Sequence, residues 1–77
     1  MNAARRKNLK EILAKLSEVR SDLEAIASEE RDAFDNLPQG LQEGDRGQAM
    51  DAAATALEDA FSELETMEST LEELLEG

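Results

Sequence analysis

The sequence predicts an all-α fold: an antiparallel helical hairpin of the coiled-coil type that dimerises into a four-helix bundle. Three observations lead to this prediction. Apolar residues recur at alternating intervals of three and four in both halves of the chain, the single proline lies between the halves, and a basic beginning can pair with an acidic end. Intervals of three and four are the heptad spacing of two packed helices. One domain is expected over residues 1–77.

The first helix is expected over about residues 3–36. One stripe of this helix should face the second helix, and it consists of Leu9, Ile12, Leu16, Val19, Leu23, Ile26, Glu30 and Ala33. Glu30 is its one polar member, and we interpret it as a register-fixing residue whose head reaches water rather than as a metal ligand. Pro38 ends the helix because a proline disfavours helical geometry in the residue before it.

The second helix is expected over about residues 46–75, after a connection over residues 37–45. Asp45 and Gln48 have the spacing of a capping box that satisfies the first free amides of a helix. The facing stripe of this helix consists of Met50, Ala53, Leu57, Ala60, Leu64, Met67, Leu71 and Leu74. Because the connection is short, the chain must reverse direction there.

A partner surface is predicted beside this seam. The seam is the line along which the two facing stripes meet. In each stripe, every second residue is followed in the sequence by a residue that lies beside the seam. These following residues are mostly apolar and include both aromatic residues, which an isolated hairpin would leave half exposed. We expect a second copy of the chain to cover them, because two-fold dimers dominate among soluble oligomers. The expected dimer or partner face comprises Leu13, Arg20, Phe34, Phe61, Glu68 and Leu75. In the alternative interpretation, Leu37 and Leu41 fold over Phe34 and leave a monomer.

The composition excludes several kinds of function. The chain has no cysteine and no histidine, so disulfides, thiol chemistry, imidazole catalysis and the common zinc and haem sites are absent. We therefore expect no enzyme, no catalytic residue, no cofactor and no metal. A net charge of −11 also argues against direct binding to nucleic acid or to anionic lipid. No apolar run approaches the roughly 18 residues of a membrane span, so we expect a cytoplasmic protein.

The charge is distributed unevenly along the chain. Residues 1–20 hold six bases and two acids, which gives +4, and the other 57 residues therefore carry −15. The expected reversal of the chain lays this basic segment along the last twenty residues, which hold eight acids and no base. The two ends should attract each other.

An acidic partner face is predicted on the second helix. Acids recur every seven residues, about 10.5 Å apart in a helix, and two further acids lie beside them. This face comprises Asp51, Glu58, Asp59, Glu65, Glu72 and Glu73. One interpretation is a surface that imitates nucleic-acid phosphates for a protein that normally binds them. The other is a solvated face that keeps a small protein soluble, as most charge stripes do.

The middle of the chain resembles a known group of proteins. The stretch runs from Glu29 to Gln42. It begins with Glu-Glu, continues after three residues with Phe-Asp-Asn-Leu-Pro, and ends after two more residues with Leu-Gln. An Ala/Glu-rich helix follows. This part of the chain is similar to small uncharacterised proteins of bacteriophages and prophages over about residues 29–60. This resemblance implies a phage or prophage source, the cytoplasm of a host cell and a helical hairpin. It implies no activity.

The expected function is a non-enzymatic, homodimeric interaction module that binds a host or phage protein. A more specific expectation is an inhibitor of a host defence nuclease, with anti-CRISPR or anti-restriction activity, that works through its acidic helix. The alternative is a structural or scaffolding bundle that organises other phage proteins.

Overall fold

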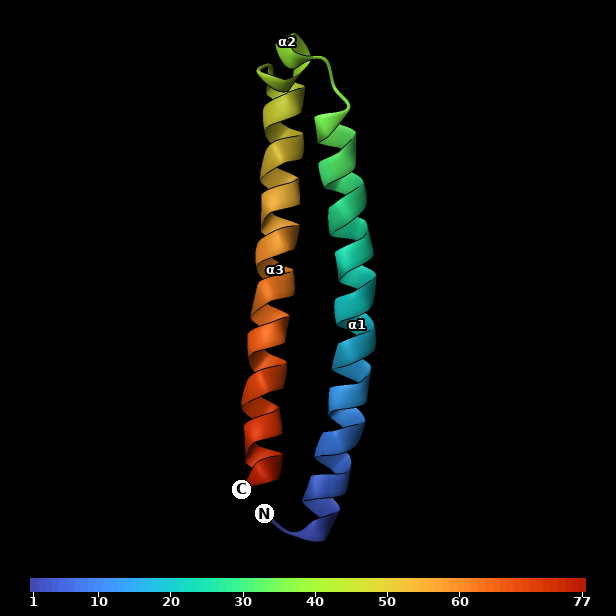
Figure 1. The fold of residues 1–77 in the computed structure, drawn as a ribbon, viewed down its shortest axis with the longest axis vertical. Coiled ribbons are helices and arrows are strands. Elements are labelled where there is room, and N and C mark those ends of the chain that lie inside the picture. Colours follow the sequence, from blue (N-terminus) through green and yellow to red (C-terminus); the bar gives the residue numbers. More distant parts are fainter.

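The computed structural model describes all 77 residues and contains two long helices and one short one. Helix α1 spans Ala3–Asp35, α2 spans Gln39–Gln42 and α3 spans Asp45–Glu76, and there is no strand. Helices α1 and α3 lie side by side and run in opposite directions, so both termini are at the same end of the molecule (Figure 1). The rod measures 57 × 15 × 14 Å. The all-α hairpin is therefore confirmed, whereas the four-helix bundle stays a prediction.

The helix ends differ slightly from expectation. Helix α1 begins after Asn2, whose side-chain Oδ1 accepts a hydrogen bond of 2.8 Å from the backbone N–H of Arg5. It ends at Asp35, one residue before the expected limit. Helix α3 begins at Asp45, one residue early, because Gly44 takes the N-cap position. The expected capping box is not formed, since the Gln48 side chain donates instead to the carbonyl oxygen of Glu43 at 3.1 Å.

The connection is held together by backbone carbonyl groups. The side-chain amide of Gln42 donates to the carbonyl oxygens of Phe34, at 3.2 Å, and Leu37, at 3.0 Å, and so satisfies acceptors that the end of α1 leaves free. Gly47 is buried against α2, where a Cβ atom would lie only 2.3 Å from the Gln42 carbonyl oxygen. Only glycine permits this close approach. Leu41 is 59% exposed and does not cover the end of the core.

The seam between the helices is rotated relative to the sequence-based expectation. On α1 the seam residues are Leu9, Leu13, Leu16, Arg20, Leu23, Ala27, Glu30 and Phe34, which are buried or half-buried, and Arg6 and Arg31 beside the seam are half-buried as well. On α3 the corresponding seam residues are Met50, Ala54, Leu57, Phe61, Leu64, Glu68, Leu71 and Leu75. Ile12, Val19 and Ile26, expected in the seam, are instead 47–53% exposed, and Met67 and Leu74 are similarly exposed. At every second position of the seam, the observed residue is therefore the one that follows the expected residue in the sequence. For example, Arg20 takes the place expected for Val19.

This rotation corrects the predicted partner face. Leu13, Arg20, Phe34, Phe61, Glu68 and Leu75 line the seam of the hairpin and are not left as an open flank. Two physical reasons favour the rotation. Ala27 and Ala54 are small enough for close packing, with 5% and 0% of their surface exposed. In addition, the charges of Arg20 and Glu68 neutralise each other across the seam, with 2.5 Å between Nε and Oε2.

The core of the hairpin is thin. Four of the 77 residues are buried: Ala27, Gly47, Ala54 and Glu68. None of the larger aliphatic side chains is fully buried. Two helices alone therefore leave much of the apolar surface of this chain in contact with water.

Candidate interaction surfaces

The rotated seam leaves two flanks of different chemistry. Equivalent heptad positions of two antiparallel helices line the same flank. The polar flank consists of the residues that follow Leu9, Leu16 and their counterparts in the seam, and these are Lys10, Ser17, Glu24, Arg31, Asp51, Glu58, Glu65 and Glu72. The apolar ridge consists of the residues that precede Leu13, Arg20 and their counterparts, and these are Ile12, Val19, Ile26, Ala33, Ala53, Ala60, Met67 and Leu74.

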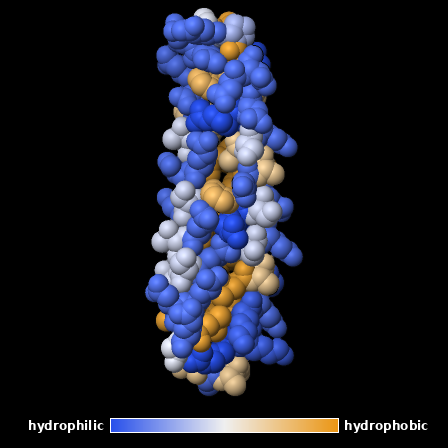
Figure 2. All heavy atoms as spheres, in the orientation of Figure 1, coloured by the Kyte–Doolittle hydropathy of each residue, from blue (hydrophilic) through white to orange (hydrophobic).

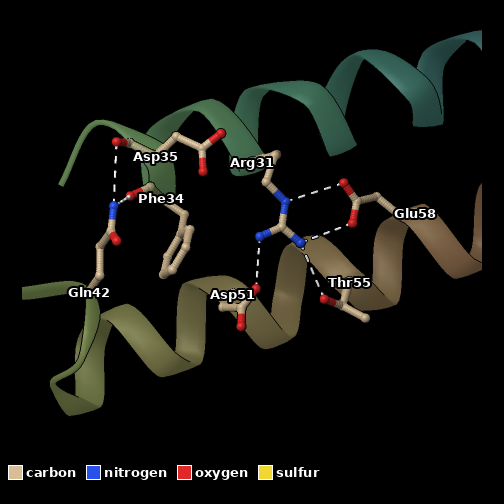
Figure 3. Close-up of polar contacts among 7 residues, drawn as sticks. All are labelled: Arg31, Phe34, Asp35, Gln42, Asp51, Thr55 and Glu58. Carbon is tan, nitrogen blue, oxygen red and sulfur yellow. Dashed lines mark hydrogen bonds and ion pairs between the residues drawn. The ribbon is translucent and has the colours of Figure 1, made fainter. Parts of the chain in front are cut away.

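Arg31 joins the two helices across the polar flank (Figure 3). Its guanidinium group donates to Glu58 through Nη2, at 2.9 Å, and through Nε, at 3.3 Å. It also donates to Asp51 Oδ1 at 2.7 Å and to Thr55 Oγ1 at 3.2 Å. The planar fork of an arginine suits this paired recognition of carboxylates. One side chain of α1 therefore binds three side chains of α3.

These hydrogen bonds shift the pKa values of the groups involved, each in the direction that favours its charged form. The hydrogen bonds to Glu58 and then Asp51 raise the pKa of Arg31 above its ordinary value. The hydrogen bond from Arg31 lowers the pKa of Glu58 below its ordinary value. The Arg31 guanidinium also lies over the Phe34 ring, with 5.6 Å between Cζ and the ring centroid. At this level of the rod, the polar flank therefore pairs one positive charge with two negative charges.

Two further arginines of α1 contact α3. The Arg20 guanidinium bonds to Glu68, which is 8% exposed, and it lies 5.9 Å from the centroid of the Phe61 ring. Arg6 donates through Nη1 to the carbonyl oxygen of Leu75 at 2.7 Å. On the face drawn in Figure 2, hydrophobic atoms gather mainly along a line between the helices, and strongly hydrophilic atoms interrupt this line.

The predicted acidic face divides into two parts, one paired and one unpaired. Asp51 and Glu58 are both bound by Arg31, so half of their charge is neutralised and the three side chains together carry −1. The other four residues of this face are exposed and form no ion pair within 4.0 Å, and they are Asp59, Glu65, Glu72 and Glu73. Glu63 and Glu76 are exposed nearby, also without an ion pair. The unpaired acids extend over about 26 Å of α3 at 1.5 Å per residue.

The basic first segment lies beside these acids, as expected from the chain reversal (Figure 1). Arg20 is the one base of this segment that forms an ion pair, with Glu68. The bases outside Arg20 and Arg31 form no ion pair within 4.0 Å, and these are Arg5, Arg6, Lys7, Lys10, Lys15 and Arg46. Apart from the Arg20–Glu68 pair, attraction between the two ends is therefore a long-range effect that salt can screen.

The apolar ridge is the surface that sequence reasoning missed, because it placed these residues in the seam. None of the 19 acids of the chain occupies any of its eight positions. Its large side chains are about half exposed, and Ala33 and Ala53 are exposed as well. Beside the ridge, Thr66, Met67, Thr70 and Leu71 line a shallow, mainly apolar groove. All eight residues of the ridge are apolar, four on each helix.

The other two hollows of the surface are open and lined mostly by polar side chains. The widest hollow is an open groove on the polar flank that includes Glu24, Arg31 and Phe61 in its lining. No group of three or more acidic, histidine or cysteine side chains is arranged to hold a metal ion. None of the three helices combines the length and the apolar character that a membrane crossing requires.

The chain matches no known protein family, no curated protein and no solved structure.

Proposed function

We propose that this chain is a non-enzymatic interaction module of phage or prophage origin that binds a protein through the exposed acids of α3. In the specific form of this proposal, the partner is a host defence nuclease whose basic groove normally holds nucleic acid. The chain then inhibits the nuclease by occupying this groove, as an anti-CRISPR or anti-restriction protein. The source rests on the resemblance of residues 29–60, and the mode of binding rests on charge.

The observation that supports this mode is the row of unpaired acids from Asp59 to Glu76. Six of these acids have no base within 4.0 Å, and they are Asp59, Glu63, Glu65, Glu72, Glu73 and Glu76. They give one negative charge per about 4.3 Å of helix, compared with one per about 3.4 Å for a single nucleic-acid strand and about 1.7 Å for duplex DNA. The spacing is closer to one strand than to a duplex.

The bases near this row offset it only in part. Arg6, Arg20 and Arg31 are bound to other groups of α3, and the chain as a whole keeps a net charge of −11. A basic groove would experience a long-range attraction to such a surface and would bind it faster at low salt.

The test is capture of partners from a bacterial host lysate on the immobilised chain, followed by competition. We expect a nucleic-acid-binding protein to be retained at about 50 mM salt and released at about 200 mM, because charge-dependent contacts weaken steeply over this range. A short oligonucleotide should displace the same protein. Retention that is unchanged by salt and by the oligonucleotide would contradict the proposal.

A matched pair of variants makes this test specific. The triple variant Glu65→Gln, Glu72→Gln and Glu73→Gln removes three unpaired acids from α3 and should lose the partner. The control Glu11→Gln, Glu18→Gln and Asp32→Asn removes three exposed acids from α1 and should retain it. Both variants change the net charge by the same three units. Equal loss in both would show that only total charge matters.

A structural or scaffolding bundle that organises other phage proteins is the second candidate function, and the apolar ridge favours it. Contacts through such a ridge bury apolar surface and are insensitive to salt. A partner that remains bound at high salt, and that the α3 triple variant still retains, would support this function over inhibition.

A further inference from the structure

We infer that the apolar ridge is the interface at which a second copy of this chain docks, to form a closed two-fold dimer with four long helices. The inference concerns a different surface from the acids of α3 and is independent of the partner that they bind. It also replaces the dimer face expected from the sequence, whose residues are used within the hairpin.

The first argument is the number of apolar positions in each heptad. A helix facing one partner helix needs two such positions, whereas a helix inside a bundle uses three. Helices α1 and α3 each carry three: the two of the seam and the one of the ridge. The hairpin accounts for two of these positions, so the third indicates a further layer of helices.

The second argument is surface area. A compact folded chain of 8.5 kDa exposes about 4,650 Å² by the usual scaling with mass, but this rod exposes 5512 Å². The excess is about 850 Å², which is close to the roughly 800 Å² that each partner buries in a stable interface of standard size. Burial of the ridge by one more copy would therefore give an ordinary amount of exposed surface.

The third argument concerns which occupant fits. The ridge is about 31 Å long from Ile12 to Ala33. It carries aliphatic side chains on both helices and small alanines that allow close approach, so it can pack against itself around a two-fold axis. An anionic lipid surface would be repelled by the net charge of −11. A second copy is the occupant that the shape and the area favour.

Sedimentation equilibrium of the purified chain tests this inference. The wild type should sediment at twice the 8.5 kDa of one chain at high micromolar concentration, and should still do so at about 1 M salt, where a charge-dependent contact is screened. A mass of 8.5 kDa under these conditions would overturn the inference. The result does not depend on whether any host protein is captured.

Variants locate the interface. The double variant Val19→Glu and Ile26→Glu should raise the dimer dissociation constant at least about 100-fold, because it places unpaired charges in an apolar contact. The control Ser21→Glu and Ala25→Glu adds the same charge at exposed positions outside the ridge and should remain dimeric. If the first variant stays dimeric, or if both lose the dimer equally, the ridge is not the interface.

A milder change guards against loss of the fold. If circular dichroism shows that the charged ridge variant is unfolded, the variant Val19→Ala and Ile26→Ala removes apolar contact without adding charge. It should keep its helical signal and raise the dissociation constant by about tenfold or more, since each deleted methylene contributes about 0.8 kcal/mol of burial. An unchanged dissociation constant would overturn the inference.

Discussion

The polar flank and the apolar ridge lie on the same two helices and differ by the side of the seam on which they stand. On the polar flank, long charged side chains reach the opposite helix, and Arg31 contacts Asp51, Thr55 and Glu58. On the ridge, the large aliphatic side chains stay about half exposed. One flank is thus bridged by side chains of the hairpin, whereas the other is left partly open to water.

This difference explains the rotation of the helix pair. A turn that buried Ile12, Val19 and Ile26 would move Arg20 and Glu68 out of the seam and separate their charges. The observed rotation keeps this pair together, at the cost of leaving aliphatic residues about half exposed. The rotation of the helices is therefore decided by pairs of side chains that meet across the seam, and not by the apolar character of single residues.

The neighbours Ala53 and Ala54 should show the largest effect. Ala54 is fully buried in the seam, so Ala54→Glu should lower the free energy of unfolding by more than about 3 kcal/mol or abolish folding. Ala53 is exposed on the ridge, so Ala53→Glu should keep its helical circular dichroism and weaken only the dimer. Thermal melts at the lowest workable concentration, where dimerisation contributes least, measure the difference.

The reverse order of these two variants would be informative. If Ala53→Glu were the more destabilising of the two at low concentration, the seam would have the rotation that the sequence alone predicts. The ridge would then be part of the hairpin core.

The sequence was sufficient for the fold class and for the approximate ends of the helices, because Pro38 and the heptad spacing are local signals. It was not sufficient for the rotation of the seam. Ranking residues by apolar character put Val19 inside and Arg20 outside, since a single arginine reads as exposed. What decides the rotation is that Arg20 and Glu68 occupy equivalent heptad positions with opposite charge, a signal that appears only when the two helices are compared.

The sequence was sufficient to identify the residues of the acidic face, but not to show which of them are paired with a base. The sequence places Asp51 and Glu58 in one row with Glu65 and Glu72. Only the register of the two helices shows that Arg31 stands opposite the first two. The pairing of one base with two acids seven residues apart is the pattern that could have identified it.

The Arg20–Glu68 pair should give the next largest effect. Glu68→Ala removes the partner of a seam arginine whose side chain is 30% exposed, so urea denaturation should show a loss of about 1–3 kcal/mol. The control Glu65→Ala changes an exposed, unpaired acid and should stay within about 0.5 kcal/mol. Replacement of both Arg20 and Glu68 by leucine should recover the loss. Equal stability of the two single variants would mean that this pair does not fix the rotation.

Arg31 should give the smallest effect, because its ion pairs are exposed to solvent and screened by salt. Arg31→Gln should lower the thermal midpoint slightly, and more than Lys15→Gln, which removes a base without an ion pair. Since Arg31 depresses the pKa of Glu58 below its ordinary 4.5 in the folded state, this stabilisation is present above about pH 4.5. It is lost as the pH falls through the folded pKa of Glu58.

The difference in midpoint between the wild type and Arg31→Gln should therefore be constant from about pH 7 to about pH 5 and shrink in more acidic solution. A difference that grows below about pH 4.5 would show that the bond between Arg31 and Glu58 does not stabilise the fold.

The connection between α1 and α3 is held mainly by contacts to main-chain carbonyl groups. The Gln42 amide binds the carbonyl oxygens of Phe34, Asp35 and Leu37, and Gly47 rests against the carbonyl oxygens of Leu41 and Gln42. Every polypeptide supplies such carbonyl groups, so this connection depends little on the side chains of the two helices that it joins. We expect a chain that keeps the stretch from Glu29 to Gln42, together with a glycine at the position of Gly47, to make the same reversal whatever surfaces its two helices carry.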